Sequence, residues 1–290
     1  MHIETISNGL GAQSMYMLVL AAECVLPARL SITADTGWEK DRSLSTGEKI
    51  TARDYFDQVV KPYADAHGIE AVMVQANDKH GQPLPPLDEW VRKNIESGQL
   101  NHIKIPLFGS EGGRLRQPCT QRKKVMAIRQ ELRRRGATSA RMAHGLHAGE
   151  VHRMKGVHGH DEDGFYTLTD MDSKWTRHYY PLIELNKYRS DCRAELEKRG
   201  IPFLESSECD GCPHKDWPRW KRTSPEVIND LADLEMKMGG QFFFTDKRVP
   251  LKDALQLMSD EYENKLASMP APMDFDGADF GCDEGGVCGV

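Results

Sequence analysis

The sequence has no apolar run of the roughly 18 residues that a membrane helix needs; its longest such stretch, residues 15–22, is far too short. It begins without a basic segment followed by a small-residue cleavage site, so no signal peptide is expected. Positive charge is not in excess, because 38 Lys and Arg face 44 Asp and Glu for a net charge of −6. These absences predict a cytoplasmic protein with no membrane association and no global basic field for nucleic acid.

An even set of cysteines is also missing, because the chain has seven. Without an export signal, an odd set argues against a disulfide framework and for a reducing compartment. Clustered cysteines there more often bind metal or carry out redox chemistry. Cys209 and Cys212 form a Cys-x-x-Cys turn, which presents two sulfurs toward one centre. Cys24, in an apolar segment, is expected to be a small buried side chain.

What is present is a short glycine-containing loop near the start, Ile-Ser-Asn-Gly-Leu-Gly-Ala-Gln-Ser over residues 6–14. It follows a β-like run and leads directly into the apolar, helix-forming segment 15–22. A strand, a glycine turn and a helix start together favour phosphate binding, because free N–H groups and the helix dipole attract an anion. The spacing matches neither the Walker loop nor the dinucleotide fingerprint. A tight turn between a buried strand and a buried helix remains the alternative.

Strand-like and helix-like segments alternate along the chain. Strands are predicted at 30–34, 70–75, 140–146 and 180–185, and helices at 51–67, from 119 to 135 and at 190–199. This alternation predicts an α/β fold with a mostly parallel sheet and helices on both faces. We expect a nucleotide-binding domain over 1–222, a helical C-terminal region over 223–269 and a flexible tail over 270–290. At 39% apolar content, a sizeable core is expected.

The loop resembles the PP-loop of the adenine-nucleotide alpha-hydrolase superfamily, in the Ser-x-Gly-x-Gly-x-Gln-Ser form of relatives of phosphoadenosine phosphosulfate (PAPS) reductase. Four further motifs follow in that family's order and extend the resemblance to about residue 235: Asp35-Thr36-Gly37, Cys119-x-x-Arg122-Lys123, the polar cluster 150–155, and Cys209-x-x-Cys212. The resemblance implies a Rossmann-like (HUP-type) sheet. It also implies an adenine-nucleotide-dependent sulfur-metabolism enzyme similar to PAPS or adenylyl-sulfate reductase.

The resemblance also implies roles for individual residues. The nucleotide, ATP or adenylyl sulfate, would be bound by residues of the loop and of the second strand's end: Ser7, Asn8, Gly9, Gly11, Gln13, Ser14, Asp35, Thr36 and Gly37. The catalytic candidates are Arg122, Lys123, Glu150, Arg153 and Cys288. Many PP-loops have Asp where this chain has Gln13, and the loss of that carboxylate counts against magnesium-assisted ATP cleavage. Mg²⁺ remains a candidate cofactor. A thioredoxin-like electron donor is the implied protein partner.

A metal centre is predicted from four cysteines. In assimilatory adenylyl-sulfate reductases a cysteine pair at a helix start and a later Cys-x-x-Cys hold a [4Fe–4S] cluster. Cys119, Cys209 and Cys212 stand in that order here, but Thr120 replaces the second cysteine of the pair. Cys192 is the candidate for the missing ligand. Four thiolates suit zinc as well as an iron–sulfur cluster, and zinc is the alternative.

Two other functional classes are retained. One is an ATP pyrophosphatase-type enzyme that modifies nucleic acid with sulfur, similar to phosphorothioation or thiolation proteins, with the basic helix from Arg122 to Arg135 as its contact surface. The other is a non-catalytic nucleotide-binding module. In the reductases a cysteine of the C-terminal tail attacks the sulfur of the bound nucleotide; Cys288 is the candidate, and an inert tail is the alternative.

Overall fold

A computed structural model describes residues 1–116, 118–154, 157–160, 166–168 and 175–268. The predicted tail 270–290, with the candidate Cys288, lies outside the described residues. No helix in the described ranges is both long enough and apolar enough to span a membrane.

Five parallel strands form the central sheet, in the order β10-β7-β1-β2-β5. Their bounds are β1 (His2–Asn8), β2 (Leu30–Ala34), β5 (Glu70–Val74), β7 (Ser139–His144) and β10 (Thr176–Tyr179). The chain runs outward from β1 to β2 and β5, then crosses to β7 and β10 on the other side. This confirms the predicted α/β class. The change of direction between β1 and β7 makes a switch point, where open α/β sheets bind ligands beyond the carboxyl ends of their strands.

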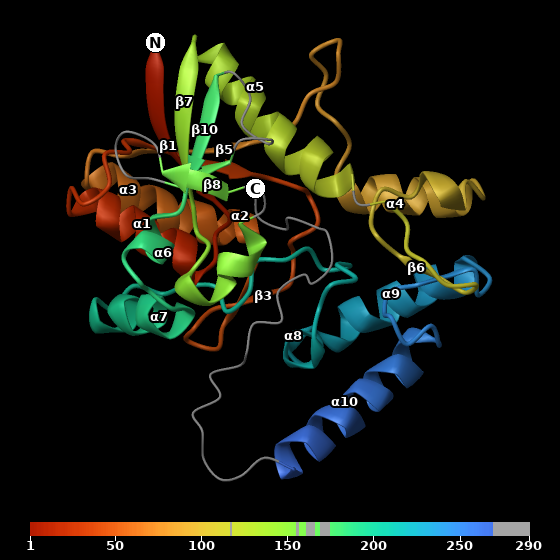
Figure 1. Cartoon of the computed structure of the whole chain (residues 1–290). Coiled ribbons are helices and arrows are strands. Elements are labelled where there is room, and N and C mark those ends of the chain that lie inside the picture. Colours follow the sequence, from red (N-terminus) through yellow and green to blue (C-terminus); the bar gives the residue numbers. More distant parts are fainter. Residues whose placement is uncertain (117, 155–156, 161–165, 169–174, 269–290) are drawn as a thin grey trace.

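Helices cover both faces of this sheet (Figure 1). On one face lie α1 (Ala12–Ala22), α2 (Ala52–Tyr55), α3 (Lys61–Ala66) and α7 (Arg189–Lys198), and their buried side chains form the first core cluster with Ile6 and Ala143. The π-helical turn η1 (Phe56–Val60) joins α2 to α3. On the other face lies α5 (Met126–Arg134), whose Ile128 and Leu132 pack against Ile32 and Met142.

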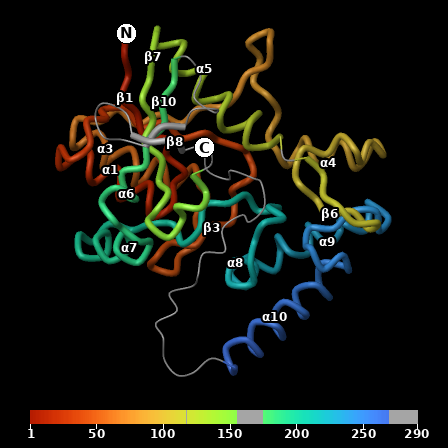
Figure 2. The backbone as a smooth tube through the Cα atoms, in the orientation of Figure 1, coloured from red at the N-terminus to blue at the C-terminus, as the bar shows by residue number. Residues whose placement is uncertain are grey.

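A second core lies beside the sheet. It is built from α4 (Leu87–Glu96), α8 (Trp217–Arg222), α9 (Pro225–Lys237), the first turns of α10 (Leu251–Ala267) and residues 103–107. The predicted C-terminal region therefore packs with residues from the middle of the chain as well as with itself. Residues 260–267 of α10 are exposed, and Figure 2 shows α10 projecting from the rest of the chain.

Three two-stranded ribbons and short helical turns complete the described structure. The ribbons are β3 (Arg42–Ser43) with β4 (Lys49–Ile50), β6 (Phe108–Gly109) with β11 (Phe242–Phe243), and β8 (Val157–His160) with β9 (Tyr166–Leu168). The turns are the 3₁₀ segments η2 (Leu100–His102) and η4 (Ala148–Arg153), and the π-helical η3 (Thr120–Val125).

The predicted strand 180–185 is wrong. Strand β10 ends at Tyr179, and residues Pro181–Glu184 form the short helix α6. Pro181 stands at the first helical position, where its fixed φ suits a helix and its missing N–H is not needed. The apolar run here reflects burial of Leu182 and Ile183 within a helical turn.

Gly37 ties the end of β2 to the start of α4. Its φ is +79°, and an added Cβ would lie 2.6 Å from Pro86 Cβ. Gly47 also has a positive φ, +89°, but an added Cβ would meet nothing within 4 Å.

We expect Gly37→Ala to lower the free energy of unfolding by about 1 kcal/mol for the left-handed backbone and by about 1–3 kcal/mol more for the overlap. The matched variant Gly47→Ala should lose only the backbone contribution. Urea unfolding of both proteins measures the difference. Equal losses would contradict the close approach to Pro86.

Candidate functional site

The loop between β1 and α1 is folded tightly by its own side chains. Asn8 Oδ1 accepts a hydrogen bond from Leu10 N at 2.8 Å, and Gly9 N donates to Ser14 Oγ at 3.0 Å. Leu10 has a φ of 66°, and Gly11 begins α1 without a side-chain cap. The first N–H groups of α1 therefore have no acceptor within the helix and are available to an anion.

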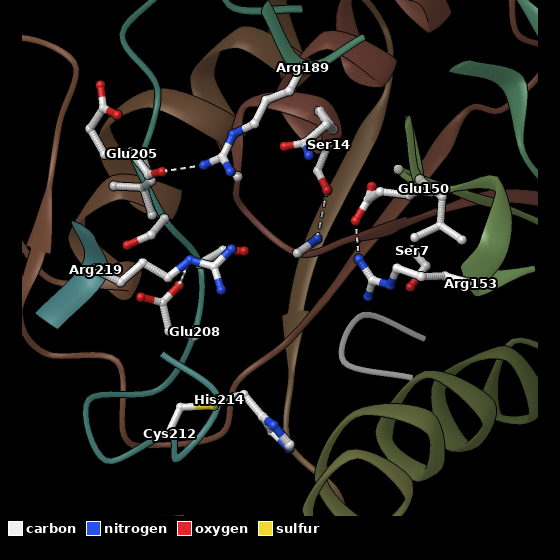
Figure 3. Close-up of a pocket in the computed structure, with 18 of the residues that line it drawn as sticks. Ser7, Ser14, Glu150, Arg153, Arg189, Glu205, Glu208, Cys212, His214 and Arg219 are labelled. Carbon is white, nitrogen blue, oxygen red and sulfur yellow. Dashed lines mark hydrogen bonds and ion pairs between the residues drawn. The ribbon is translucent and has the colours of Figure 1, made fainter. Parts of the chain in front are cut away.

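A pocket of about 150 Å³ opens against this loop (Figure 3). One wall is the loop itself and the second is the segment that follows β7. The third is the segment that leads through the Cys-x-x-Cys turn into α8. The lining residues are Ser7, Gly9, Gly11, Gln13, Ser14, Lys124, Gly145, Leu146, Glu150, Arg153, Arg189, Leu204, Glu205, Ser206, Ser207, Glu208, Cys212, His214 and Arg219. The pocket thus lies at the switch point between β1 and β7.

Four cationic side chains reach this pocket from different elements: Lys124, Arg153, Arg189 and Arg219. Arg189 Nη2 donates to the Glu205 carbonyl oxygen at 2.7 Å, which holds its guanidinium at the pocket wall. Arg219 Nε lies 4.0 Å from Glu208 Oε2. Burial acts to raise the pKa of Glu208, but the charges of Arg219, Arg42 and Lys215 outweigh it, so the pKa is lowered and the carboxylate stays ionised.

Glu150 and Arg153 form one unit within η4. The buried Glu150 carboxylate pairs with Arg153 Nη1 and accepts a hydrogen bond from His147 N at 3.1 Å. This arrangement fixes the turn and directs Arg153 to the pocket. Their predicted catalytic roles stay predictions.

A second, smaller chamber of about 30 Å³ lies on the other side of the loop. Its walls are the apolar side chains of Leu10, Ala34 and Ile128, together with Thr33, Glu39 and Lys124. Thr33 Oγ1 is buried and has no hydrogen-bond partner within the described residues. Ser7, Gly9 and Lys124 line both chambers, so the two meet at the loop.

The structure brings together most of the predicted loop residues but not the second motif. Ser7, Gly9, Gly11, Gln13 and Ser14 line the larger pocket, whereas Asn8 lines the smaller chamber and shapes the loop. Asp35-Thr36-Gly37 lines neither chamber. Asp35 is engaged by Arg53 at 2.6 Å and by Gly37 N at 2.8 Å.

The predicted basic pair Arg122 and Lys123 does not face the pocket. The buried Lys123 donates from Nζ to the carbonyl oxygens of Leu84 and Pro85, and Arg122 lies 5.8 Å from the centre of the Trp90 ring. Lys124 lines the pocket instead. Residues 120–125 are π-helical, so side-chain directions here depart from ordinary helical spacing.

At the far end of the predicted nucleic-acid surface, Arg134 and Arg135 both bind Glu131, and Arg135 also binds Glu70 at 2.6 Å. Arg133 lies over the Trp175 ring. Two of the three arginines are thus ion-paired within the chain, and the side chain of Arg134 is still largely exposed. This contact surface stays a prediction.

The four predicted metal-binding cysteines do not meet. Cys209 Sγ lies 3.3 Å from Thr36 Oγ1 and 3.7 Å from Glu39 Oε1. Cys119 and Cys209 both pack against the second core. Cys212 lines the pocket. Cys192 is fully buried in the first core, where burial raises its pKa to about 12, so its prediction as a ligand is corrected. Cys24 is exposed, not buried as expected.

Among the described residues, no group of three or more His, Cys, Asp or Glu side chains is arranged to hold a metal ion. The three remaining thiols therefore do not fit a cluster in this arrangement, and no chemical step is derived through one.

Several pocket residues are not among the predicted site residues: Lys124, Gly145, Arg189, Ser207, Glu208, His214 and Arg219. Leu204 forms a parallel bridge with Gly11, and this long-range contact brings residues 204–208 to the loop. The nearest sequence signal was the Cys-x-x-Cys turn that lies among them.

No family model matches the sequence, and no curated protein matches it. Among solved structures, U34-tRNA thiolase NcsA from Methanococcus maripaludis with its [4Fe-4S] cluster aligns over 94% of this chain and 74% of its own length, at 13% identity and a TM-score of 0.37. At that TM-score the likeness carries no functional argument.

We expect Lys124→Ala to weaken ATP binding by about 10- to 100-fold, since one charge-assisted contact contributes about 1.5–3 kcal/mol. The matched variant Lys123→Ala should bind ATP like the wild type, although it loses a buried contact. Calorimetric titration with ATP measures both. A larger loss in Lys123→Ala would restore the original assignment.

Cys192 should be chemically silent in the native protein, because it is fully buried and its pKa is raised. We expect iodoacetamide to label Cys24 readily and Cys192 only after unfolding, as read by peptide mass spectrometry. Cys192→Ala should also leave any bound metal unchanged. Rapid native labelling of Cys192, or loss of metal in Cys192→Ala, would contradict this placement.

Proposed function

We propose that this chain binds ATP at the loop 9–14 and activates an acceptor by adenylation, in preparation for the transfer of sulfur. The observation that carries the proposal is the uncapped start of α1 facing Lys124, Arg153, Arg189 and Arg219 across one pocket. Helix N–H groups and guanidinium groups together are the donors that phosphates prefer.

The larger pocket suits the phosphates, because its four cations outnumber the carboxylates of Glu150, Glu205 and Glu208. The smaller chamber continues from it with apolar walls and with Thr33 Oγ1, which has no hydrogen-bond partner within the described residues. At about 30 Å³ this chamber would have to widen to admit the edge of a base. The ribose would then lie against Ser7 and Gly9, where the chambers meet. Mg²⁺ would be held mainly by the phosphates, because Gln13 brings no carboxylate to the loop.

The proposed step is a displacement at the α-phosphorus. An oxygen of the acceptor forms a bond to that phosphorus, the bond to the bridging oxygen breaks, and pyrophosphate leaves with the electron pair. The chain's residues need only hold the phosphates in line and neutralise the developing charge, which is the largest contribution in reactions of this kind. Arg153 and Arg219 are held by Glu150 and Glu208 and are thus preorganised.

Cys212 supports a reaction that transfers sulfur to the activated acceptor, because its thiol lies at the same pocket as the proposed phosphate-binding loop. We take a nucleic-acid base as the acceptor. Adenylyl-sulfate reduction, which would use Cys288, is the competing function. The [4Fe–4S] cluster predicted from Cys119, Cys209 and Cys212, with zinc as the alternative, stays a prediction, because these thiols are not arranged to hold a metal ion within the described residues. Iron, sulfide and zinc analysis of protein purified without oxygen decides between them.

Radiolabelled pyrophosphate exchange into ATP tests the proposal, because only cleavage at the α-phosphorus returns label to ATP. We expect exchange in the wild type in the presence of pooled tRNA or DNA. Gly11→Val should abolish it, since a Cβ at Gly11 already lies 3.3 Å from Ser207 Oγ and two further methyl groups enter the pocket.

Gly136→Val, two residues beyond the end of α5, serves as a control, because an added Cβ there meets nothing within 4 Å. Gly136 has a positive φ, so thermal unfolding measures the stability that this variant loses through backbone strain. Formation of ADP and phosphate without exchange would overturn the adenylation proposal. Sulfite release from adenylyl sulfate with a thiol donor would establish the reductive function instead.

A further inference from the structure

The acidic residue inside the Cys-x-x-Cys turn is buried and fully engaged. Asp210 is 3% exposed, and its carboxylate accepts hydrogen bonds from Lys40 N at 3.0 Å and Asp41 N at 3.3 Å. It also pairs with Arg42 Nη2, and its own N–H donates to the Trp38 carbonyl oxygen at 2.8 Å. The turn is therefore fixed to residues 38–42, which follow the second strand of the sheet.

Arg42 is as deeply buried as its partner, at 2% exposed. Burial acts to lower its pKa, but Asp210, Glu208 and Glu39 raise it by more, so the guanidinium stays charged. A buried ion pair is a poor device for stability alone, because desolvation offsets most of the attraction. A buried ion pair that also accepts hydrogen bonds favours one arrangement of the backbone around it.

The next residue of the turn is pressed against an aromatic ring. A Cβ added at Gly211 would lie 2.3 Å from both Cζ2 and Cη2 of Trp38. Trp38 is itself 3% exposed and belongs to the second core, so it cannot move aside without loss of packing. Asp210 and Gly211 thus fix the turn from two directions.

The consequence is that the two thiols of one turn face different surroundings. Cys209 lies against Thr36 and Glu39, whereas Cys212 lines the large pocket (Figure 3). Neither direction follows from the Cys-x-x-Cys spacing, because the turn could rotate as a unit.

We infer that Arg42, Asp210 and the Trp38–Gly211 contact position the turn so that Cys212 forms part of the wall of the phosphate-binding pocket. Arg42 and Asp210 are positioning residues that act through the turn, since neither lines the pocket. Only the reading of that pocket as a nucleotide site rests on the proposed function. The placement of Cys212 does not depend on it.

The test follows the alkylation of Cys212 by iodoacetamide, with and without ATP, using peptide mass spectrometry. In the wild type we expect slow labelling that ATP slows further. Gly211→Ala should displace the turn from Trp38, speed labelling of Cys212 by about tenfold and remove the protection by ATP. Phenylalanine lacks Cζ2 and Cη2 of the indole, so Trp38→Phe combined with Gly211→Ala should restore the wild-type rate.

Arg42→Met should speed labelling in the same way, whereas Arg92→Met removes the partly exposed ion pair with Asp230 and should have no effect on Cys212. Thermal unfolding accompanies each variant. Wild-type labelling in a folded Gly211→Ala protein, or lost stability without a change in labelling, would overturn the inference. Faster labelling in the variants without any ATP protection in the wild type would support positioning and count against the nucleotide site.

Discussion

The uncapped start of α1 is the constraint on which the site depends. A helix that begins at Gly11 without a side-chain acceptor leaves its first N–H groups in need of a partner. The sheet places this end beside β7 at the switch point, and the remaining pocket walls are built around it. Gly145, after β7, passes so close that an added Cβ would lie 3.3 Å from Gln13 Cβ. A side chain at position 145 would therefore press on the start of α1, and glycine avoids this contact.

The features that the sequence predicts correctly are those determined by residues close together in the chain. The glycine loop between β1 and α1 and the parallel sheet depend on glycines, apolar periodicity and helix starts, all of which are local. The side on which a helical residue faces is not local where a π-turn intervenes, so Lys123 was predicted in place of Lys124. The prediction of Cys192 as a metal ligand is wrong for a similar reason. Cys192 on α7 packs in the first core with α1, and spacing alone does not distinguish a buried thiol from a ligand.

A run of basic residues is an equally poor guide to the pocket. Arg133 to Arg135 form such a run, yet none of them lines the pocket, and Arg134 and Arg135 pair with Glu131 and Glu70. The pocket arginines are scattered at 153, 189 and 219, on three separate elements. An anion site is made by convergence of single cations from separate elements, because several adjacent cations on one helix point in different directions.

Residues 36–42 connect the sheet, α4 and the Cys-x-x-Cys turn and fix their relative positions. Leu87 N donates to the Thr36 carbonyl oxygen at 2.8 Å, and Gly37 packs on Pro86, so this segment is joined to α4. Its other end, through Trp38 and Arg42, carries the Cys-x-x-Cys turn. Since the segment begins where β2 ends, the sheet, the second core and Cys212 share one short piece of backbone. The direction of the Cys212 thiol is thus set by contacts that lie outside the Cys-x-x-Cys turn itself.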